Sequence, residues 1–189
     1  MTTPREAVER AGIDVNALIG LLSSAARAEL SSVYRYTVLA AHSIGFADEG
    51  LREILRDIRA ENRHHFDALV MRIHELGGSL PEQIRPFLGD GDERQDDVFA
   101  GPADPAEALI ESVQQAVRTY AGLRDLTEGK DQRTAALVQA IQNEKSEHVA
   151  WLGEFFGRGP RGRFRRGFRG GSPLLARLPD TEEGTQPPA

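Results

Sequence analysis

The chain has 189 residues, of which 40% are hydrophobic and 28% are charged, so it suits one packed domain with or without a tail. No apolar run reaches the roughly 18 residues of a membrane-spanning helix, which excludes a membrane protein, and the N-terminus lacks the apolar core of a signal peptide, which predicts a cytoplasmic location. Cysteine is absent, which excludes disulfides, cysteine nucleophiles, iron–sulfur clusters and zinc sites built on thiolates.

The charges are segregated along the chain. Residues 1–157 carry 16 basic and 26 acidic side chains, for a formal net charge of −10. Residues 158–178 carry +7, and residues 179–189 carry −3. The basic stretch is rich in glycine and has no helical periodicity, which is typical of disordered segments. We therefore predict a folded acidic body at 1–157 and a flexible basic tail at 158–189.

Four long stretches carry apolar residues at helical spacing, and none shows the sustained alternation of a strand. They predict helices over about residues 15–44, 48–76, 104–126 and 132–156. Gly77 follows the second helix as a stop signal. The third helix begins at Asp-Pro, an N-cap residue followed by a proline at the first helical position.

The connections between these helices predict the topology. Residues 43–46 and 128–131 are short links, so the first and second helices and the third and fourth helices are each expected to form an antiparallel hairpin. Residues 77–103 form a much longer link, rich in Pro, Gly and Asp, which can return along the bundle. The prediction is an all-α fold, an antiparallel four-helix bundle with one long crossover.

Three acidic residues are predicted on buried helix faces. Helical wheels place Glu29, Glu61 and Glu144 among apolar residues, about midway along the first, second and fourth helices. Two of these acids have a histidine at helical spacing, His64 and His148. Buried carboxylates are costly and repel one another, and the inner faces of the first and third helices offer no Lys or Arg. A pair of iron or manganese ions would neutralise them; a polar core without metal is the alternative.

Three pieces of the sequence then match a known pattern: Glu29 with Tyr36 two turns later, Glu61-x-x-His64, and Glu144 to His148 followed by Trp151-Leu152. The bundle resembles the ferritin-like di-iron superfamily, in particular bacterioferritin and Dps-like proteins, over about residues 13–157. The resemblance implies a ferritin-like fold and a di-iron centre. Such a centre acts as a ferroxidase, oxidising Fe(II) with O₂ or peroxide for iron storage or oxidative-stress protection.

The resemblance also implies roles for single residues. Glu29 and His64 would be terminal ligands, and Glu61 would bridge the two ions. Tyr36 would lie near the centre as a hydrogen-bond donor or one-electron source. No haem is expected, because Asn62 stands where a bacterioferritin-type Met ligand would be. Members of the family assemble into homo-oligomers, and the lack of a fifth amphipathic helix favours a Dps-like dodecamer.

The fourth helix departs from the family pattern, which expects Glu-x-x-His there. The sequence Glu144-Lys145-Ser146-Glu147-His148 allows two registers. If His148 keeps the family position, Lys145 occupies the bridging slot. If Glu144 keeps it, Glu147 replaces the terminal histidine or His148 reaches in from the side. The third helix places no acid on its inner face, so one metal position is expected to be weak or lost.

The tail supports two interpretations. Seven arginines, interleaved with Phe164, Phe168 and glycines, resemble segments that bind DNA or RNA through phosphates and stacking. The alternative is a solvated extension that folds against the acidic body. The apolar stretch Leu174–Leu178 suggests docking into an encapsulin-type shell. Two other functions stay open: a ferritin-like scaffold with a degenerate metal site that works through its tail, and a di-metal oxygenase.

Overall fold

The structure, a computed structural model, describes residues 2–42, 49–88 and 105–157, and this part of the chain is all helical. Its elements are α1 (Pro4–Arg10), α2 (Val15–His42), α3 (Glu49–Glu75), α4 (Ile84–Leu88), α5 (Pro105–Thr127) and α6 (Gln132–Gly157). The four long helices lie within two residues of the predicted bounds at every described end. The predicted tail at 158–189 lies outside the described residues.

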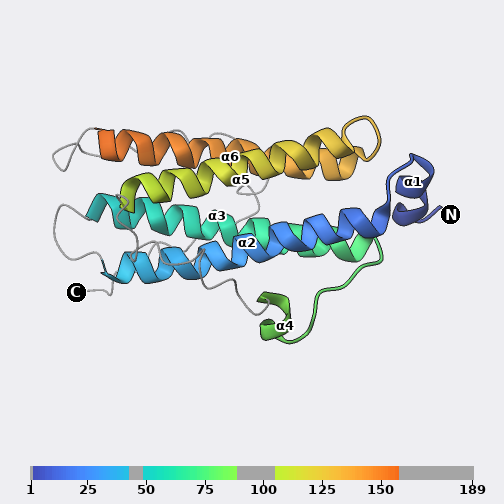
Figure 1. Ribbon diagram of the computed structural model, residues 1–189, viewed down its shortest axis with the longest axis horizontal. Coiled ribbons are helices and arrows are strands. Elements are labelled where there is room, and N and C mark those ends of the chain that lie inside the picture. Colours follow the sequence, from blue (N-terminus) through green and yellow to red (C-terminus); the bar gives the residue numbers. More distant parts are fainter. Residues whose placement is uncertain (1, 43–48, 89–104, 158–189) are drawn as a thin grey trace, which may run out of the picture.

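The four long helices form the predicted bundle (Figure 1). α2 packs against α3, α5 packs against α6, and the two hairpins meet where α3 contacts α6. α3 and α5 both run from left to right in Figure 1, so the chain must return along the bundle between them. The predicted all-α fold, a bundle of four long helices, is therefore confirmed. None of the described helices is long and apolar enough to cross a membrane.

Two short helices were missing from the prediction. α1 has a local signal, because Thr3 and Glu6 form a capping box around Pro4, which stands at the first helical position. α4 lies in the described part of the predicted crossover and buries Phe87. Both helices are short and add one buried side chain each, Val8 and Phe87, to the apolar core at their end of the bundle.

A glycine, predicted as a stop signal, and an aspartate fix two helix ends. Gly77 has a φ of 77°, and its N–H and that of Gly78 donate to the carbonyl oxygens of His74 and Ile73, which closes α3 with a Schellman motif. Asp131 precedes α6 and accepts a 3.1 Å hydrogen bond from the backbone N–H of Thr134, as an N-cap does.

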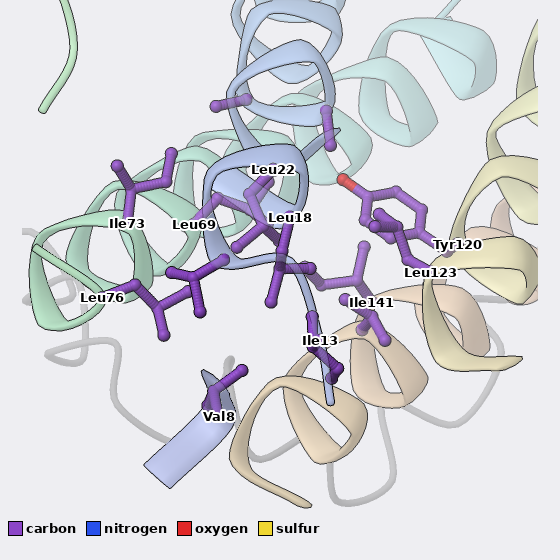
Figure 2. Packing of buried hydrophobic residues seen from close by; sticks show 14 of the residues in the cluster. Val8, Ile13, Leu18, Leu22, Leu69, Ile73, Leu76, Tyr120, Leu123 and Ile141 are labelled. Carbon is purple, nitrogen blue, oxygen red and sulfur yellow. The ribbon is translucent and has the colours of Figure 1, made fainter. Parts of the chain in front are cut away.

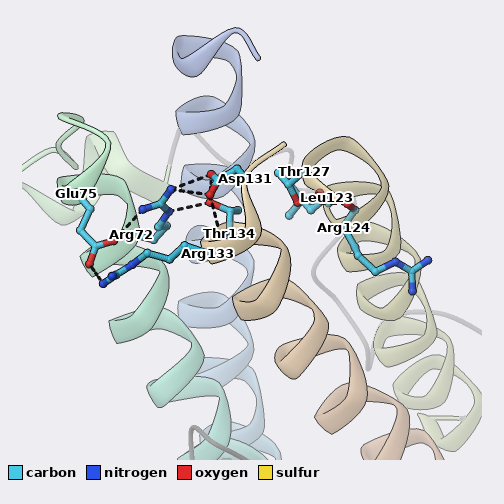
Figure 3. A network of polar contacts seen from close by, with 8 residues as sticks. All are labelled: Arg72, Glu75, Leu123, Arg124, Thr127, Asp131, Arg133 and Thr134. Atoms are coloured by element: carbon cyan, nitrogen blue, oxygen red, sulfur yellow. Dashed lines mark hydrogen bonds and ion pairs between the residues drawn. The ribbon is translucent and has the colours of Figure 1, made fainter. Parts of the chain in front are cut away.

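A buried ion pair joins these two helix ends (Figure 3). The Arg72 guanidinium donates to both carboxylate oxygens of Asp131, at 3.0 and 2.8 Å, and its Nε donates to the Thr134 hydroxyl at 2.7 Å. Glu75 accepts a further bond from Arg72 at 2.9 Å and also pairs with the exposed Arg133. The end of α3 is thus fixed to the start of α6.

The apolar core is divided into two clusters. The first lies at the α1 end and includes Leu18, Leu22, Leu69, Ile73 and Ile141 (Figure 2). The second lies toward the other end; its members include Tyr36, Ile54, Ile58, Val113, Trp151 and Leu152. Apart from Arg72 and Thr134 of the ion pair at the α1 end, the buried polar residues of α3 and α6 fall between these two sets, so a polar layer crosses the middle of the bundle.

Candidate metal centre

The polar layer is built by all four long helices. It is defined here as Glu29 of α2, Glu61, Asn62 and His65 of α3, Tyr120 of α5, and Glu144, Lys145 and His148 of α6. Each of these side chains is buried, with at most 4% of any residue exposed. Burial of this many charges requires partners, because an unpaired charge in a protein interior is strongly destabilising.

Glu29 is held on one side of the layer by three groups. The Tyr120 hydroxyl donates to its Oε1 at 2.7 Å, and the Lys145 ammonium donates to its Oε2 at 2.7 Å. His65 Nδ1 lies 3.4 Å from the same Oε2. Burial alone would raise the pKa of Glu29, but the nearby Lys145 and His65 outweigh burial and lower that pKa to about 2. Glu29 is therefore an anion at neutral pH.

Two carboxylate–imidazole pairs form the other side of the layer. His65 Nε2 lies 2.6 Å from Glu144 Oε2, and His148 Nε2 is hydrogen-bonded to Glu61 Oε2. The two imidazole rings are stacked with their centroids 6.5 Å apart. Both pairs join α3 to α6, so they place two carboxylates and two imidazoles at one contact between helices.

The pKa values of the two histidines are shifted in opposite directions. Both ring nitrogens of His65 face carboxylates, an arrangement that favours two N–H donors and hence the imidazolium. Burial opposes this charge, but the charge of Glu29 and the bond to Glu144 raise the pKa of His65. Burial, together with the positive charges of Lys145 and His65, holds the pKa of His148 well below its usual value. This low pKa favours the neutral ring, in which donation from Nε2 to Glu61 leaves the lone pair on Nδ1.

Two potential metal-binding atoms of the layer lack a hydrogen-bond partner within the described part of the chain, Glu144 Oε1 and His148 Nδ1. Such orphaned buried atoms are rare and call for an explanation. The two atoms are a carboxylate oxygen and an imidazole nitrogen, which are donor types that suit iron or manganese. In the described residues no three His, Asp or Glu side chains already converge as metal ligands, so binding requires the carboxylate–imidazole pairs to open.

Lys145 brings a positive charge into the layer. Lys145 is 4% exposed, and its ammonium group donates to Glu29 Oε2 and to Asn62 Oδ1, both at 2.7 Å. The sequence argument for metal ions rested on the lack of inward cations on the first and third helices. The fourth helix supplies the cation that this argument did not count.

The inward histidine of α3 is His65 and not His64, so the expected orientation of His64 is wrong. His64 is half-buried, and its Nδ1 lies 2.6 Å from the carbonyl oxygen of Ala60 in its own helix. The Glu-x-x-His motif drew attention to His64. The signal for His65 was its spacing, seven residues after Ile58 and four before Leu69, both of which are buried.

Glu147 and Tyr36 lie outside the layer. Glu147 is exposed at its edge, where partial burial and the charges of Glu61 and Glu144 raise its pKa. Tyr36 is buried in the second apolar cluster, and burial together with the charge of Glu29 raises its pKa well above the usual value. The tyrosine that bonds to Glu29 is Tyr120, which the sequence analysis did not single out.

Of the predicted ligands, the structure therefore brings together Glu29, Glu61, Glu144 and His148. It also places both Glu144 and Lys145 in the interior, so the two registers considered for α6 do not exclude one another. α5 contributes no acid, because Val113 is buried in the second apolar cluster and Glu111 is exposed.

Comparison with known proteins agrees with this architecture. The "DNA protection during starvation protein" of Pyrococcus furiosus is 43% identical over 179 residues, which cover 92% of this chain and 95% of that protein. The bacterioferritin-related protein of Bacteroides fragilis, described as a dodecameric thioferritin, superposes with a TM-score of 0.70 at 22% identity over 81% of this chain and 91% of its own. Antigen TpF1 of Treponema pallidum gives 0.63 at 16% identity, over 77% and 92%.

These two solved structures are similar to the chain in fold. The family model of the ferritin-like domain matches residues 19–162, which contain α3, α5, α6, all but the first four residues of α2, and the whole polar layer. The chain therefore belongs to the ferritin-like family.

Proposed function

We propose that the protein binds Fe(II) in the polar layer and oxidises it with O₂ or peroxide, as part of iron storage or oxidative-stress protection. The family and the name of the Pyrococcus furiosus relative support the general role. Assembly into a homo-oligomer is part of the proposal and is supported by the description of the Bacteroides fragilis neighbour as dodecameric. Manganese is the alternative metal, because the same donor set suits it.

One observation supports the metal position most strongly. Glu61, His65, Glu144 and His148 face one another across the contact between α3 and α6, and Glu144 Oε1 and His148 Nδ1 have no hydrogen-bond partner within the described residues. Ligation of a metal ion is one way in which these atoms would gain partners. We expect Fe(II) to enter as substrate at this position, with His65 releasing its proton to become a ligand.

The buried carboxylates would favour oxidation once iron is bound. Fe(III) carries one more positive charge than Fe(II), so the anions Glu61 and Glu144 stabilise the product more than the reactant. Reduction of one peroxide to two water molecules takes two electrons, from two Fe(II) ions, and two protons. In the di-iron arrangement that the resemblance implies, Glu29 would hold a second ion.

The test is the rate of iron oxidation. Fe(II) is added to the full-length protein under anaerobic conditions, air or peroxide is admitted, and ferric absorbance is followed against buffer. Wild type is expected to exceed the buffer rate. Glu61→Gln, which keeps the size of the side chain, should abolish the excess, and Glu53→Gln, an exposed acid on the same helix, should retain it. Equal rates for wild type and Glu61→Gln would contradict the proposal.

A second candidate function is favoured by Lys145 and the tail. Lys145 neutralises part of the layer without any metal, which is what a ferritin-like scaffold with a degenerate centre would need. Such a protein would act through residues 158–189, by binding DNA or RNA or by docking into an encapsulin-type shell. Truncation after Gly157 should then abolish a DNA mobility shift that weakens steeply with salt. Equal DNA binding by the truncated protein would contradict a role for the tail.

A further inference from the structure

We infer that the Lys145 ammonium stands in for one of the two metal ions of a di-metal centre, so that the polar layer has room for one divalent ion fewer per chain than the same layer without this charge. Lys145 would thus limit how many metal ions each chain binds. The expectation of one bound ion per chain rests on the proposed function. The supporting observations are the buried position of the Lys145 ammonium and the residues that it contacts.

The contacts of Lys145 are those that a bound cation would make. Its Nζ lies 2.7 Å from a carboxylate oxygen of Glu29 and 2.7 Å from the amide oxygen of Asn62. Oxygen atoms of carboxylates and amides are also the ligands that small cations select. The ammonium thus occupies the oxygen-lined half of the layer.

Lysine suits the place of a metal ion better than arginine does. The chain has 23 basic side chains, of which only Lys130 and Lys145 are lysines. Lys130 is exposed in the turn before α6, so Lys145 is the buried one. An ammonium is a compact point charge with donors in several directions, whereas a guanidinium is a planar fork. A compact charge is what can replace a metal ion among ligands arranged around a point.

The remaining half of the layer is left for the metal. Glu61, His65, Glu144 and His148 form two pairs between α3 and α6, and the orphaned Glu144 Oε1 and His148 Nδ1 belong to these pairs. A second divalent ion on Glu29 would share an oxygen with the ammonium and be repelled by it at close range. Lys145 therefore sets how many ions the layer binds.

The test counts Co(II), which resembles Fe(II) but does not react with air on this timescale, in the full-length protein. Equilibrium dialysis with metal analysis gives ions per chain at saturation for wild type, for Lys145→Glu and for the surface control Lys130→Glu. We expect one ion for wild type and for Lys130→Glu, and two for Lys145→Glu. If Lys145→Glu does not fold, Lys145→Gln carries the same test, because it removes the charge and keeps a hydrogen-bonding group beside Glu29.

The outcomes separate the two proposals. A wild-type count of two, or no gain of an ion on removing the charge of Lys145, would overturn the inference. No ion in wild type together with one in the Lys145 variant would support the inference and contradict the proposed iron binding. No ion in either protein would overturn both. The absorption bands of Co(II) should show one set of signals in wild type and an additional set in the variant.

Discussion

Replacement of Asp131 by alanine should destabilise the protein strongly, because it breaks the ion pair that fixes the end of α3 to the start of α6 (Figure 3). Arg72 is 3% exposed and Asp131 is 5% exposed, so the pair is largely shielded from water. Asp131→Ala leaves the guanidinium buried with fewer partners and also removes the N-cap of α6.

The expected magnitude follows from these two losses. Removing one partner of a buried ion pair costs about 3–5 kcal/mol, and removing an N-cap costs about 1 kcal/mol. Arg72 keeps its bonds to Glu75 and to the Thr134 hydroxyl, which places the total near the lower end, at about 3–4 kcal/mol. For a chain of this size about 1 kcal/mol corresponds to about 2–4 °C, so Tm should fall by about 6–16 °C.

The assay is thermal and denaturant unfolding at a fixed protein concentration, since assembly also contributes to stability. Arg133→Ala is the matched control, because the Arg133 side chain is 71% exposed and its ion pair with Glu75 should contribute at most about 1 kcal/mol. A loss below about 1 kcal/mol for Asp131→Ala, or equal losses for both variants, would refute the reasoning.

The difference in the free energy of unfolding between wild type and Asp131→Ala should depend on pH. Burial raises the pKa of Asp131, but the hydrogen bonds from Thr134 and Arg72 outweigh it, and the pKa in the folded protein is lowered. A carboxyl group with a lowered pKa stabilises the fold above its unfolded pKa, and this stabilisation is lost as the pH falls through the folded value. The difference between wild type and Asp131→Ala should therefore be full at pH 7 and shrink at strongly acidic pH.

Two further predictions concern the polar layer. His65→Gln should weaken Fe(II) or Co(II) binding at least tenfold in a metal titration, because His65 faces Glu144. His64→Gln should change the metal affinity little, because His64 contacts its own helix. The reverse order would refute the assignment of His65 as the inward histidine. Tyr120→Phe should lower the free energy of unfolding by about 1–3 kcal/mol, because it leaves an oxygen of the buried Glu29 without its donor. Tyr34→Phe, at a position 74% exposed, should leave the free energy of unfolding unchanged. Chemical denaturation measures both variants.

The sequence predicted the helices well because their signals are local. Apolar spacing and the glycine after α3 act within a few residues, and α3 ends as predicted. The N-cap aspartate before α6 is an equally local signal, which the structure shows. The capping box of α1 is equally local and was overlooked. The acidic residues on inner faces follow from the same periodicity, and Glu29, Glu61 and Glu144 are all buried.

The tertiary structure decided which of these groups meet. α6 packs against both α5 and α3, so the buried face of α6 is wide enough to include Glu144, Lys145 and His148 together. A helical wheel with one narrow inner stripe treated Lys145 and Glu144 as alternatives. His65 was passed over in favour of His64 because a motif of three-residue spacing was considered without the position of the neighbouring helix.

The sequence by itself determined that this chain forms an antiparallel four-helix bundle with carboxylates in its middle, because helix periodicity and capping depend only on nearby residues. Only the tertiary structure decided how these charges are balanced. Lys145 lies 116 residues from its partner Glu29, and His65 lies 79 residues from Glu144, so their pairing depends on how the two hairpins dock. Contacts of that kind have no local signal, because the atoms involved come together only once the helices have packed.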